Sequence, residues 1–159
     1  MSQSHKTAWI TGASSGIGEA LAKAFVGGGG HAILSGRNVA ELQRVADETG
    51  APERCLVLPF DTVDYDGLAD KVSKAIAFQG SVDVLVNNAG ISQRSPAVDT
   101  DLSVYQRIVD VDLLAPIALT QALLSHMVSR RAGHIVMISS VAGKAGIPMR
   151  TAYCASKHG

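Results

Sequence analysis

Short apolar runs alternate with longer segments of helical period along the whole chain of 159 residues. This alternation is typical of βαβ units, in which helices join parallel strands and pack on their sheet. We predict strands at Thr7–Thr11, His31–Ser35, Cys55–Pro59, Val82–Asn87 and His134–Ser139, and helices at Ile17–Val26, Val39–Thr49, Tyr65–Phe78 and Ser103–Arg130. The pattern predicts an α/β fold with a doubly wound, Rossmann-type parallel sheet of about five strands.

The last predicted helix contains a stretch, Leu113–Val128, that is apolar on almost every face. Pro116 predicts a break or bend there, because proline lacks an N–H and clashes with the preceding turn. The stretch is shorter than the ~20 residues of a membrane span, so we expect no membrane partner. A helix that is apolar all round needs cover on two sides. We expect the sheet on one side and a second subunit on the other, and we expect His126 to face solvent or a helix carbonyl.

Composition narrows the class of protein. Fourteen basic and fourteen acidic residues cancel, so we expect a small-molecule substrate rather than nucleic acid or anionic lipid. The length and 47% hydrophobic content fit one domain over residues 1–159. The N-terminus has no apolar run of signal-peptide length, which predicts a cytoplasmic protein. Cys55 and Cys154 are too few for a disulfide framework and lack metal-ligating neighbours, so we expect free thiols and no metal.

The run TGASSGIG, from Thr11 to Gly18, joins the first predicted strand to the first helix. Where glycine lacks a side chain, backbone amides can approach a pyrophosphate at the positive end of the helix. No Gly-Lys-Ser/Thr follows, which argues against a P-loop nucleotidase. Tight strand-to-helix turns also recruit glycine without a ligand. The candidate cofactor-binding residues of this loop are Gly12, Ser14, Ser15, Gly16, Ile17 and Gly18.

The residues after the second predicted strand bear on the choice of cofactor. An acidic residue roughly 20 positions beyond the glycines would bind the ribose hydroxyls of NAD. Here the sequence reads Ser35-Gly36-Arg37-Asn38, without a carboxylate and with a guanidinium. Arginine can bond phosphate in a bidentate manner, so Arg37 favours NADP over NAD. The alternative for Arg37 alone is a solvated arginine at a helix start.

The chain resembles the classical short-chain dehydrogenases/reductases from Thr7 to Gly159. Three motifs carry the resemblance: TGASSGIG, the NNAG element Asn87–Gly90, and the YxxxK signature Tyr153–Lys157. The resemblance implies that Asp61 contacts the adenine ring and that Asn88, Ala89 and Gly90 lie on the cofactor side of the sheet. It also implies a homo-oligomer and NADP as cofactor.

Three side chains form a candidate catalytic set. Carbonyl reduction by hydride transfer needs a proton donor, and a phenol can serve if its pKa falls from about 10. Tyr153 is this candidate, and Lys157 at i+4 would stabilise the phenolate and reach the nicotinamide ribose. Ser140, thirteen residues before the tyrosine, could hydrogen-bond the substrate oxygen. Each residue alone has an ordinary structural explanation, and only the set behind a dinucleotide loop indicates an NADP-dependent oxidoreductase acting on a carbonyl or secondary alcohol.

Asp112 departs from the resemblance and joins the candidate catalytic residues. The family commonly has asparagine here, and that residue helps to hold a water that relays protons to the lysine. If the relay uses the backbone carbonyl, aspartate would serve nearly as well. If it uses the side chain, a carboxylate near Lys157 would favour the charged ammonium. We hypothesise a functional but altered relay; the alternative is a buried helix aspartate with a structural hydrogen bond.

The sequence supplies five of the six strands of a 3-2-1-4-5-6 sheet, and Gly159 follows Lys157 by two residues. We therefore expect the C-terminal part of the fold, with its substrate-binding loop, to be missing. Helices below ~12–15 residues are marginal without tertiary packing, so the segment Tyr153–Gly159 should be poorly held. Two alternatives to an active enzyme stay open: a catalytically silent nucleotide-binding or oligomerisation fragment, and a fragment that pairs with a separate C-terminal piece.

Overall fold

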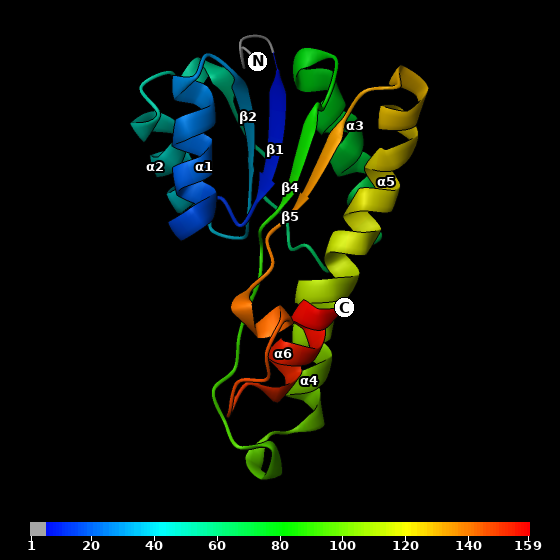
Figure 1. Ribbon diagram of the computed structural model, residues 1–159. Coiled ribbons are helices and arrows are strands. Elements are labelled where there is room, and N and C mark those ends of the chain that lie inside the picture. The colour runs from blue at the N-terminus through cyan, green and yellow to red at the C-terminus, as the bar shows by residue number, and fades with distance from the viewer. Residues whose placement is uncertain (1–5) are drawn as a thin grey trace.

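Five parallel strands form one sheet in the order β3-β2-β1-β4-β5 (Figure 1). The computed structural model describes residues 6–159, so the first five residues of the N-terminus, on which the expectation of no signal peptide partly rests, lie outside the described residues. The strands are β1 (Thr7–Thr11), β2 (His31–Ser35), β3 (Cys55–Val57), β4 (Val84–Asn87) and β5 (His134–Met137). This arrangement confirms the predicted doubly wound α/β fold.

Helices cover both faces of the sheet and leave a core on each side (Figure 1). The helices are α1 (Gly16–Gly27), α2 (Val39–Glu48), α3 (Leu68–Gln79), α4 (Leu102–Val109), α5 (Ala115–Arg130) and α6 (Thr151–His158). One core cluster joins Ala22 and Val45 of the first two helices to Ile10 of β1. The other joins Leu123 of α5 to Trp9 of β1. Every residue of β1 is buried, as expected of a central strand with helices on both faces.

Several element boundaries differ from the sequence-based prediction. Strand β3 ends at Val57 rather than Pro59, although the N–H groups of Leu58 and Phe60 still donate to the carbonyls of Leu34 at 3.0 Å and Gly36 at 3.1 Å. Helix α3 begins at Leu68 rather than Tyr65. A turn precedes it, because the Asp64 carboxylate accepts a hydrogen bond from the Gly67 N–H at 3.3 Å. Such side chain to backbone bonds delay the helix start without changing the topology.

The predicted helix Ser103–Arg130 exists, but its irregularity lies before Pro116. A π-helical turn, η3 (Asp110–Leu114), separates α4 from α5. Pro116 is in the first turn of α5, where a missing N–H is tolerated. In an α-helix, residue 116 would donate to the carbonyl of Asp112, and proline cannot. The missing N–H of Pro116 therefore affects the turn before it, so the irregular turn is Asp110–Leu114 rather than Pro116 itself.

The helical run Leu102–Arg130 is long and apolar enough to cross a membrane by length and composition alone. Part of its apolar surface packs in the protein, where Leu119, Leu123 and Met127 lie in the core. The opposite side is exposed, and Ile117, Leu124 and Val128 have exposed fractions of 43%, 42% and 64%. We expected protein to cover this helix on two sides, and among the described residues the core covers one of them.

His126 makes a contact outside the expectations for this helix. Its Nε2 accepts a hydrogen bond from the backbone N–H of Val82 at 3.4 Å. We expected solvent or a helix carbonyl; the residue is half-buried and so faces solvent in part, and the bond from Val82 is a contact that we did not predict. The loop before β4 crosses the end of α5, a proximity that the sequence pattern of the helix alone does not contain.

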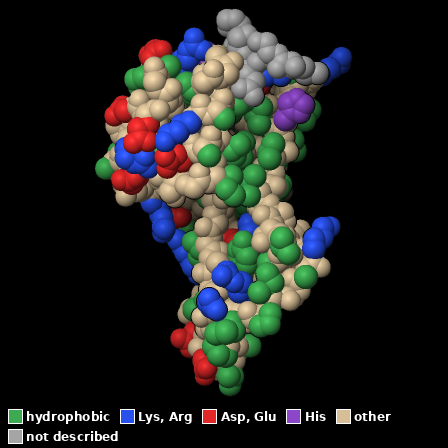
Figure 2. Space-filling view, turned by 60° about the vertical axis from the view of Figure 1, so that its left-hand side comes forward, with side chains coloured by type: hydrophobic (Ala, Val, Ile, Leu, Met, Phe, Trp, Pro, Cys, Tyr) green, Lys and Arg blue, Asp and Glu red, His purple; other side chains and the backbone are tan. Residues whose placement is uncertain are grey.

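Beyond the carboxyl ends of the strands, α4 and α6 pack side by side and form a lower lobe (Figure 1). Helix α6 carries the YxxxK signature, so the tertiary packing places this signature near the glycine loop. Figure 2 shows the hollow between the two lobes; charged side chains gather on one side of the upper lobe, and the lower lobe carries both hydrophobic and charged side chains. Strand β5 is the edge of the sheet on this side, and its four residues are exposed.

Candidate functional site

Four hydrogen bonds join the carboxyl ends of β1 and β4. The hydroxyl oxygen of Thr11 accepts from the backbone N–H groups of Asn88 and Ala89, both at 3.0 Å. The side-chain amide of Asn88 donates to the carbonyls of Thr11 at 2.9 Å and Gly12 at 3.2 Å. The NNAG element thus holds the glycine loop through the side chain of Asn88. The sequence predicted the location of Asn88 on the cofactor side but missed this bracing contact.

Two glycines make the close packing of the loop possible. Gly12 has φ +65°, a left-handed conformation that favours glycine. A Cβ added at Gly18 would overlap the carbonyl of Gly12, and backbone cannot move aside cheaply. The first turn of α1 therefore lies directly against the loop, and the N–H groups of a first helical turn have no partner within the helix. This geometry fits the pyrophosphate-binding role predicted for the loop.

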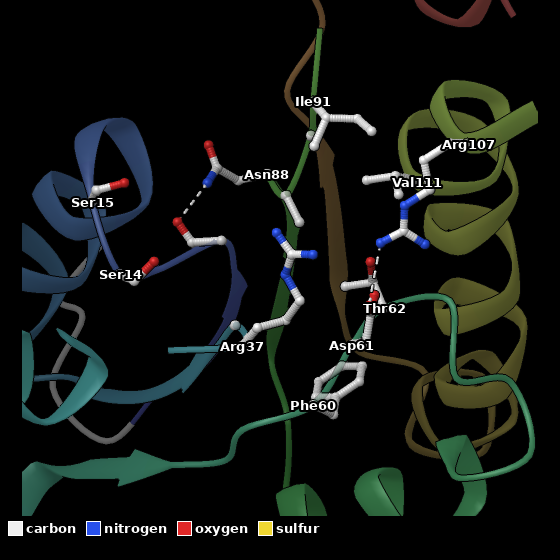
Figure 3. Close-up of a pocket in the computed structure, with 14 residues that line it drawn as sticks. Ser14, Ser15, Arg37, Phe60, Asp61, Thr62, Asn88, Ile91, Arg107 and Val111 are labelled. Atoms are coloured by element: carbon white, nitrogen blue, oxygen red, sulfur yellow. Dashed lines mark hydrogen bonds and ion pairs between the residues drawn. The ribbon is translucent and has the colours of Figure 1, made fainter. Parts of the chain in front are cut away.

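A pocket of about 360 Å³ opens beside the glycine loop (Figure 3). Nine of the predicted cofactor-binding or neighbouring residues line it: Gly12, Ser14, Ser15, Gly36, Arg37, Asp61, Asn88, Ala89 and Gly90. Gly16, Ile17 and Gly18 do not line it; Ile17 borders a second pocket. The carboxyl ends of four strands thus bring residues from separate motifs to one place, as expected for an open parallel sheet.

Two arginines point into this pocket from opposite sides (Figure 3). Arg37 follows β2, is exposed, and forms no ion pair with any of residues 6–159. Arg107 comes from α4, and its guanidinium donates to the carboxylate of Asp61 at 3.3 Å. Sequence reasoning missed Arg107, since only tertiary packing brings α4 to the end of β3. Asp61 is held at the pocket wall, and Arg37 keeps its donors free for an anion.

A charged cluster ties α2 to α1 behind the same loop. The Arg44 guanidinium contacts Glu19 at 3.0 Å, Glu41 at 2.8 Å and Glu48 at 2.8 Å. The hydrogen bonds from Arg44 and then Lys23 lower the pKa of Glu19 to about 2. Arg44 also donates to the carbonyl of Ser14 at 3.4 Å. We expect only a small contribution to stability, because these side chains are partly solvated.

The second pocket, of about 260 Å³, lies beside the predicted catalytic pair. Its lining is Ile17, Asn88, Gly90, Ile91, Ser92, Ile138, Ser139, Tyr153 and Lys157. The Lys157 ammonium lies 5.8 Å from the centre of the Tyr153 ring, on the same side of α6. It also donates to the carbonyl of Ile138 at 3.2 Å, which anchors the lysine to the chain beyond β5. Asn88 and Gly90 line both pockets, so the two spaces are neighbours.

Ser140 lies where the chain leaves β5 and starts a short 3₁₀ turn, η4 (Val141–Gly143). Its hydroxyl oxygen accepts a hydrogen bond from the N–H of Ala142 at 3.2 Å. The hydroxyl proton is still available for donation, because the oxygen is the acceptor in this bond. Ser139, rather than Ser140, lines the second pocket. A turn cap thus accounts for one of the contacts of Ser140, as its position at a strand end suggested.

Asp112 is buried in the π turn and faces Lys157. Its side chain is 0% exposed, and one oxygen accepts from the N–H of Ile91 at 2.8 Å. The other oxygen lies 3.7 Å from the Lys157 ammonium and has no hydrogen-bond partner among the described residues. Burial raises the pKa of this carboxyl, against the hydrogen bond from Ile91 and the charge of Lys157. Asp112, which stands where the family commonly has asparagine, therefore lies beside the lysine of the YxxxK signature.

Among residues 6–159, no three His, Cys, Asp or Glu side chains gather as a metal site would require. The two cysteines are free thiols there, since Cys55 and Cys154 form no disulfide. Burial raises the pKa of Cys55, and neither thiol lines the two pockets. The polar groups that line the two pockets include hydroxyl, phenol, ammonium, carboxylate and guanidinium groups.

The raised pKa of Asp112 predicts a pH-dependent effect on stability. The folded state holds the proton more tightly than the unfolded chain, so stability is lost as the pH rises past the unfolded pKa, and the loss is complete above the folded pKa. We expect Asp112→Asn to increase the free energy of unfolding at pH 7, and this gain to vanish as the pH falls to about 4. Urea unfolding at both pH values measures it. Asp110→Asn in the same turn is the matched control, and a destabilised Asp112→Asn at pH 7 would contradict the prediction.

Comparisons with known proteins agree with this geometry. A family model described as short chain dehydrogenase matches residues 6–159. Dehydrogenase/reductase SDR family member 7B of Mus musculus is 43% identical over 154 residues, which cover 94% of this chain and 48% of that protein. The Homo sapiens member 7 is 43% identical over 156 residues, covering 94% and 46%. The chain therefore spans about half the length of the curated relatives it matches.

Solved structures give the same assignment. A metagenomic short-chain oxidoreductase in complex with NADP superposes with a TM-score of 0.92 at 34% identity, covering 99% of this chain and 72% of that one. A short-chain dehydrogenase from Streptomyces avermitilis gives 0.92 at 34% identity, covering 99% and 57%. The matched family, the strand order and the neighbouring pockets lead to one conclusion. This chain belongs to the short-chain dehydrogenase family, and the dehydrogenase motifs predicted from its sequence are part of one folded site.

Proposed function

We propose that the protein is an NADP-dependent oxidoreductase that interconverts a carbonyl compound and a secondary alcohol. The observation that carries this proposal is the position of Tyr153 and Lys157 beside a pocket that adjoins the one at the glycine loop. NADPH supplies the hydride when bound, and the solved relative in complex with NADP supports this cofactor. Gly12 and Gly18 allow the loop to pack closely against Ala89, Asn88 and the start of α1, and this is the loop at which we place the pyrophosphate.

Each side chain of the site has its own role in the proposed proton transfer. The Tyr153 phenol is placed to donate a proton to the substrate oxygen, and the nearby Lys157 ammonium stabilises the phenolate that remains. The free hydroxyl proton of Ser140 is suited to hold the same oxygen. After each turnover the Tyr153 phenolate must regain a proton, and Lys157 lies between it and Asp112. Asp112 provides a carboxylate 3.7 Å away and a carbonyl without an α-helical donor.

Replacement of Tyr153 tests the proposed activity. We expect Tyr153→Phe to lower NADPH oxidation with a panel of carbonyl compounds by roughly 10²–10⁴-fold, because the proton donor is lost. NADPH affinity should stay within about twofold, since the phenol is not in the pocket at the loop. Tyr65→Phe, at an exposed tyrosine outside both pockets, is the matched control.

Two results would argue against this function. Tyr153→Phe with more than half of the original rate would exclude the phenol as the proton donor. NADPH binding without oxidation in the presence of every carbonyl compound would favour a catalytically silent nucleotide-binding module. The Asp112→Asn variant adds a test of the relay: an unchanged pH profile of turnover would mean that the backbone carbonyl suffices.

Arg37 tests the choice of cofactor. We expect Arg37→Leu to weaken NADPH binding by about 10–100-fold and to leave NADH binding unchanged, because only NADPH carries the 2′-phosphate that a guanidinium would bond. Fluorescence titration with both cofactors measures the ratio of affinities. Arg107→Leu removes an arginine of the same pocket that is paired with Asp61. This control should leave the ratio of NADPH to NADH affinity unchanged. The same ratio in the wild type, Arg37→Leu and Arg107→Leu would refute NADP selection by Arg37.

The exposed side of α5 is the proposed surface for a second copy of the chain. Ile117, Leu124 and Val128 are spaced by seven and four residues, so they lie on one side of the helix, opposite the core. A contiguous apolar surface of this kind is typical of subunit contacts. Homo-oligomers are typical of this family.

Charge on this surface should disrupt the contact. We expect Leu124→Glu to convert the oligomer to a monomer in sedimentation velocity, because a carboxylate would be buried without a partner. Val39→Glu places the same charge on an exposed apolar residue of α2 and should not change the mass. A wild-type protein that is monomeric at tens of micromolar would contradict the proposed contact.

A further inference from the structure

Helix α6 carries Tyr153, the proposed acid, and Lys157, which stabilises its phenolate. The residue before this helix does not cap it. The helix has eight residues and begins at Thr151. The preceding residue, Arg150, has φ −132° and ψ 38° and makes no side-chain cap hydrogen bond. The first N–H groups of a helix have no partners within it. A helix this short depends on outside contacts to keep its first turn in place.

A buried glutamine from a distant loop supplies the missing cap. Gln93 lies between β4 and the 3₁₀ turn η2 (Ala97–Asp99), and its residue is only 9% exposed. Its side-chain oxygen accepts a hydrogen bond from the backbone N–H of Tyr153 at 3.2 Å. Its amide nitrogen donates to the hydroxyl oxygen of Thr151 at 3.3 Å. Both ends of one amide therefore hold the first turn of α6.

The residues next to Gln93 hold the chain just before the helix. The N–H of Ser95 donates to the carbonyl of Met149 at 3.1 Å. Met149 has φ +64°, a conformation that costs free energy for a residue with a side chain and persists only when neighbours impose it. The Arg150 guanidinium hydrogen-bonds the hydroxyl of Ser92. Three residues of the segment 92–95 thus hold residues 149–153 through four hydrogen bonds.

A tyrosine of α4 completes the network. The Tyr105 hydroxyl and the Thr151 hydroxyl are 2.7 Å apart and share a hydrogen bond. Thr151 therefore links Gln93 to α4, the helix that leads into the π turn with Asp112. The loop after β4 and α4 hold the first turn of α6 from two directions. Neither contact reaches the glycine loop or the pocket beside it.

We propose that Gln93 is a positioning residue that fixes the place and phase of Tyr153. The hydrogen bond to the Tyr153 N–H fixes the backbone from which the phenol projects, and the bond to Thr151 prevents rotation of the first turn. Lys157 follows one turn later on the same side, so its place beside the phenol depends on the same anchor. The consequence for proton transfer rests on the proposed function, whereas the anchoring itself does not.

Amide hydrogen exchange of the 159-residue protein tests the anchor directly. Gln93→Leu keeps an apolar body of similar size and loses both hydrogen bonds. We expect the amides of Ala152, Tyr153 and Cys154 to exchange at least tenfold faster, with the amides of β1 unchanged. Gln93→Glu keeps an acceptor for the Tyr153 N–H, and a negative charge is favourable at a helix N-terminus, so exchange should stay near the wild-type rate. Gln79→Leu, at an exposed residue at the end of α3, is the control.

Three exchange results would overturn the proposal. The first is unchanged exchange of these amides in Gln93→Leu. The second is faster exchange of β1 as well, which would make Gln93 a general core residue. The third is wild-type exchange at Tyr153 as fast as in an unstructured peptide.

Turnover of the same variants separates this proposal from the proposed function. We expect Gln93→Leu to lower kcat at least tenfold at unchanged NADPH affinity, and Gln93→Glu to restore most of it. An equal loss of NADPH affinity would contradict a role confined to Tyr153. If the wild-type protein oxidises no NADPH with any carbonyl compound, the proposed function fails, and the exchange rates still decide whether Gln93 anchors α6.

Discussion

The joint between β1 and β4 is the constraint on which the rest of the site depends. Thr11 and Asn88 form hydrogen bonds with each other through side-chain and backbone groups, at the point where the two central strands end. Parallel strands bring their carboxyl ends to one edge, but only a specific contact fixes the glycine loop against the next loop. Once these ends are joined, the pocket forms between them, and the chain after Asn88 is directed toward the lower lobe. Loss of this joint would separate the two halves of the dinucleotide pocket.

The lower lobe is organised around two irregular segments rather than around regular helices. The π turn places Asp112 in a buried position facing Lys157, and the left-handed Met149 directs the chain into α6. Both segments carry local costs: in one, a buried carboxylate oxygen lacks a hydrogen-bond partner among the described residues, and in the other the backbone is strained. Hydrogen bonds from the loop after β4 oppose both costs, because Ile91 donates to Asp112 and Gln93 caps α6. One loop thus supports both the proposed acid and the lysine beside it.

Much of this architecture could be predicted from the sequence. Each predicted strand and helix exists, since apolar periodicity reports burial on a sheet, and the burial of apolar side chains is the main force that stabilises both cores. Motif spacing also predicted that Tyr153 and Lys157 share one side of a helix. Element ends were less accurate, because side chain to backbone bonds such as that of Asp64 compete with regular structure. The contact of His126 with Val82 and that of Arg107 with Asp61 were both missed for a common reason: each joins segments far apart in the chain.

The sequence by itself determined the order of the elements, the type of chemistry in each motif and the family to which the chain belongs. These properties are local, since they depend on periodicity, glycine content and residues a few positions apart. The tertiary structure alone decided which groups meet: Arg107 with Asp61, Asp112 with Lys157, and Gln93 with the first turn of α6. The strength of such contacts depends on distances of a few tenths of an ångström and on burial. Both quantities are set only when the strands have paired and the helices have packed on them.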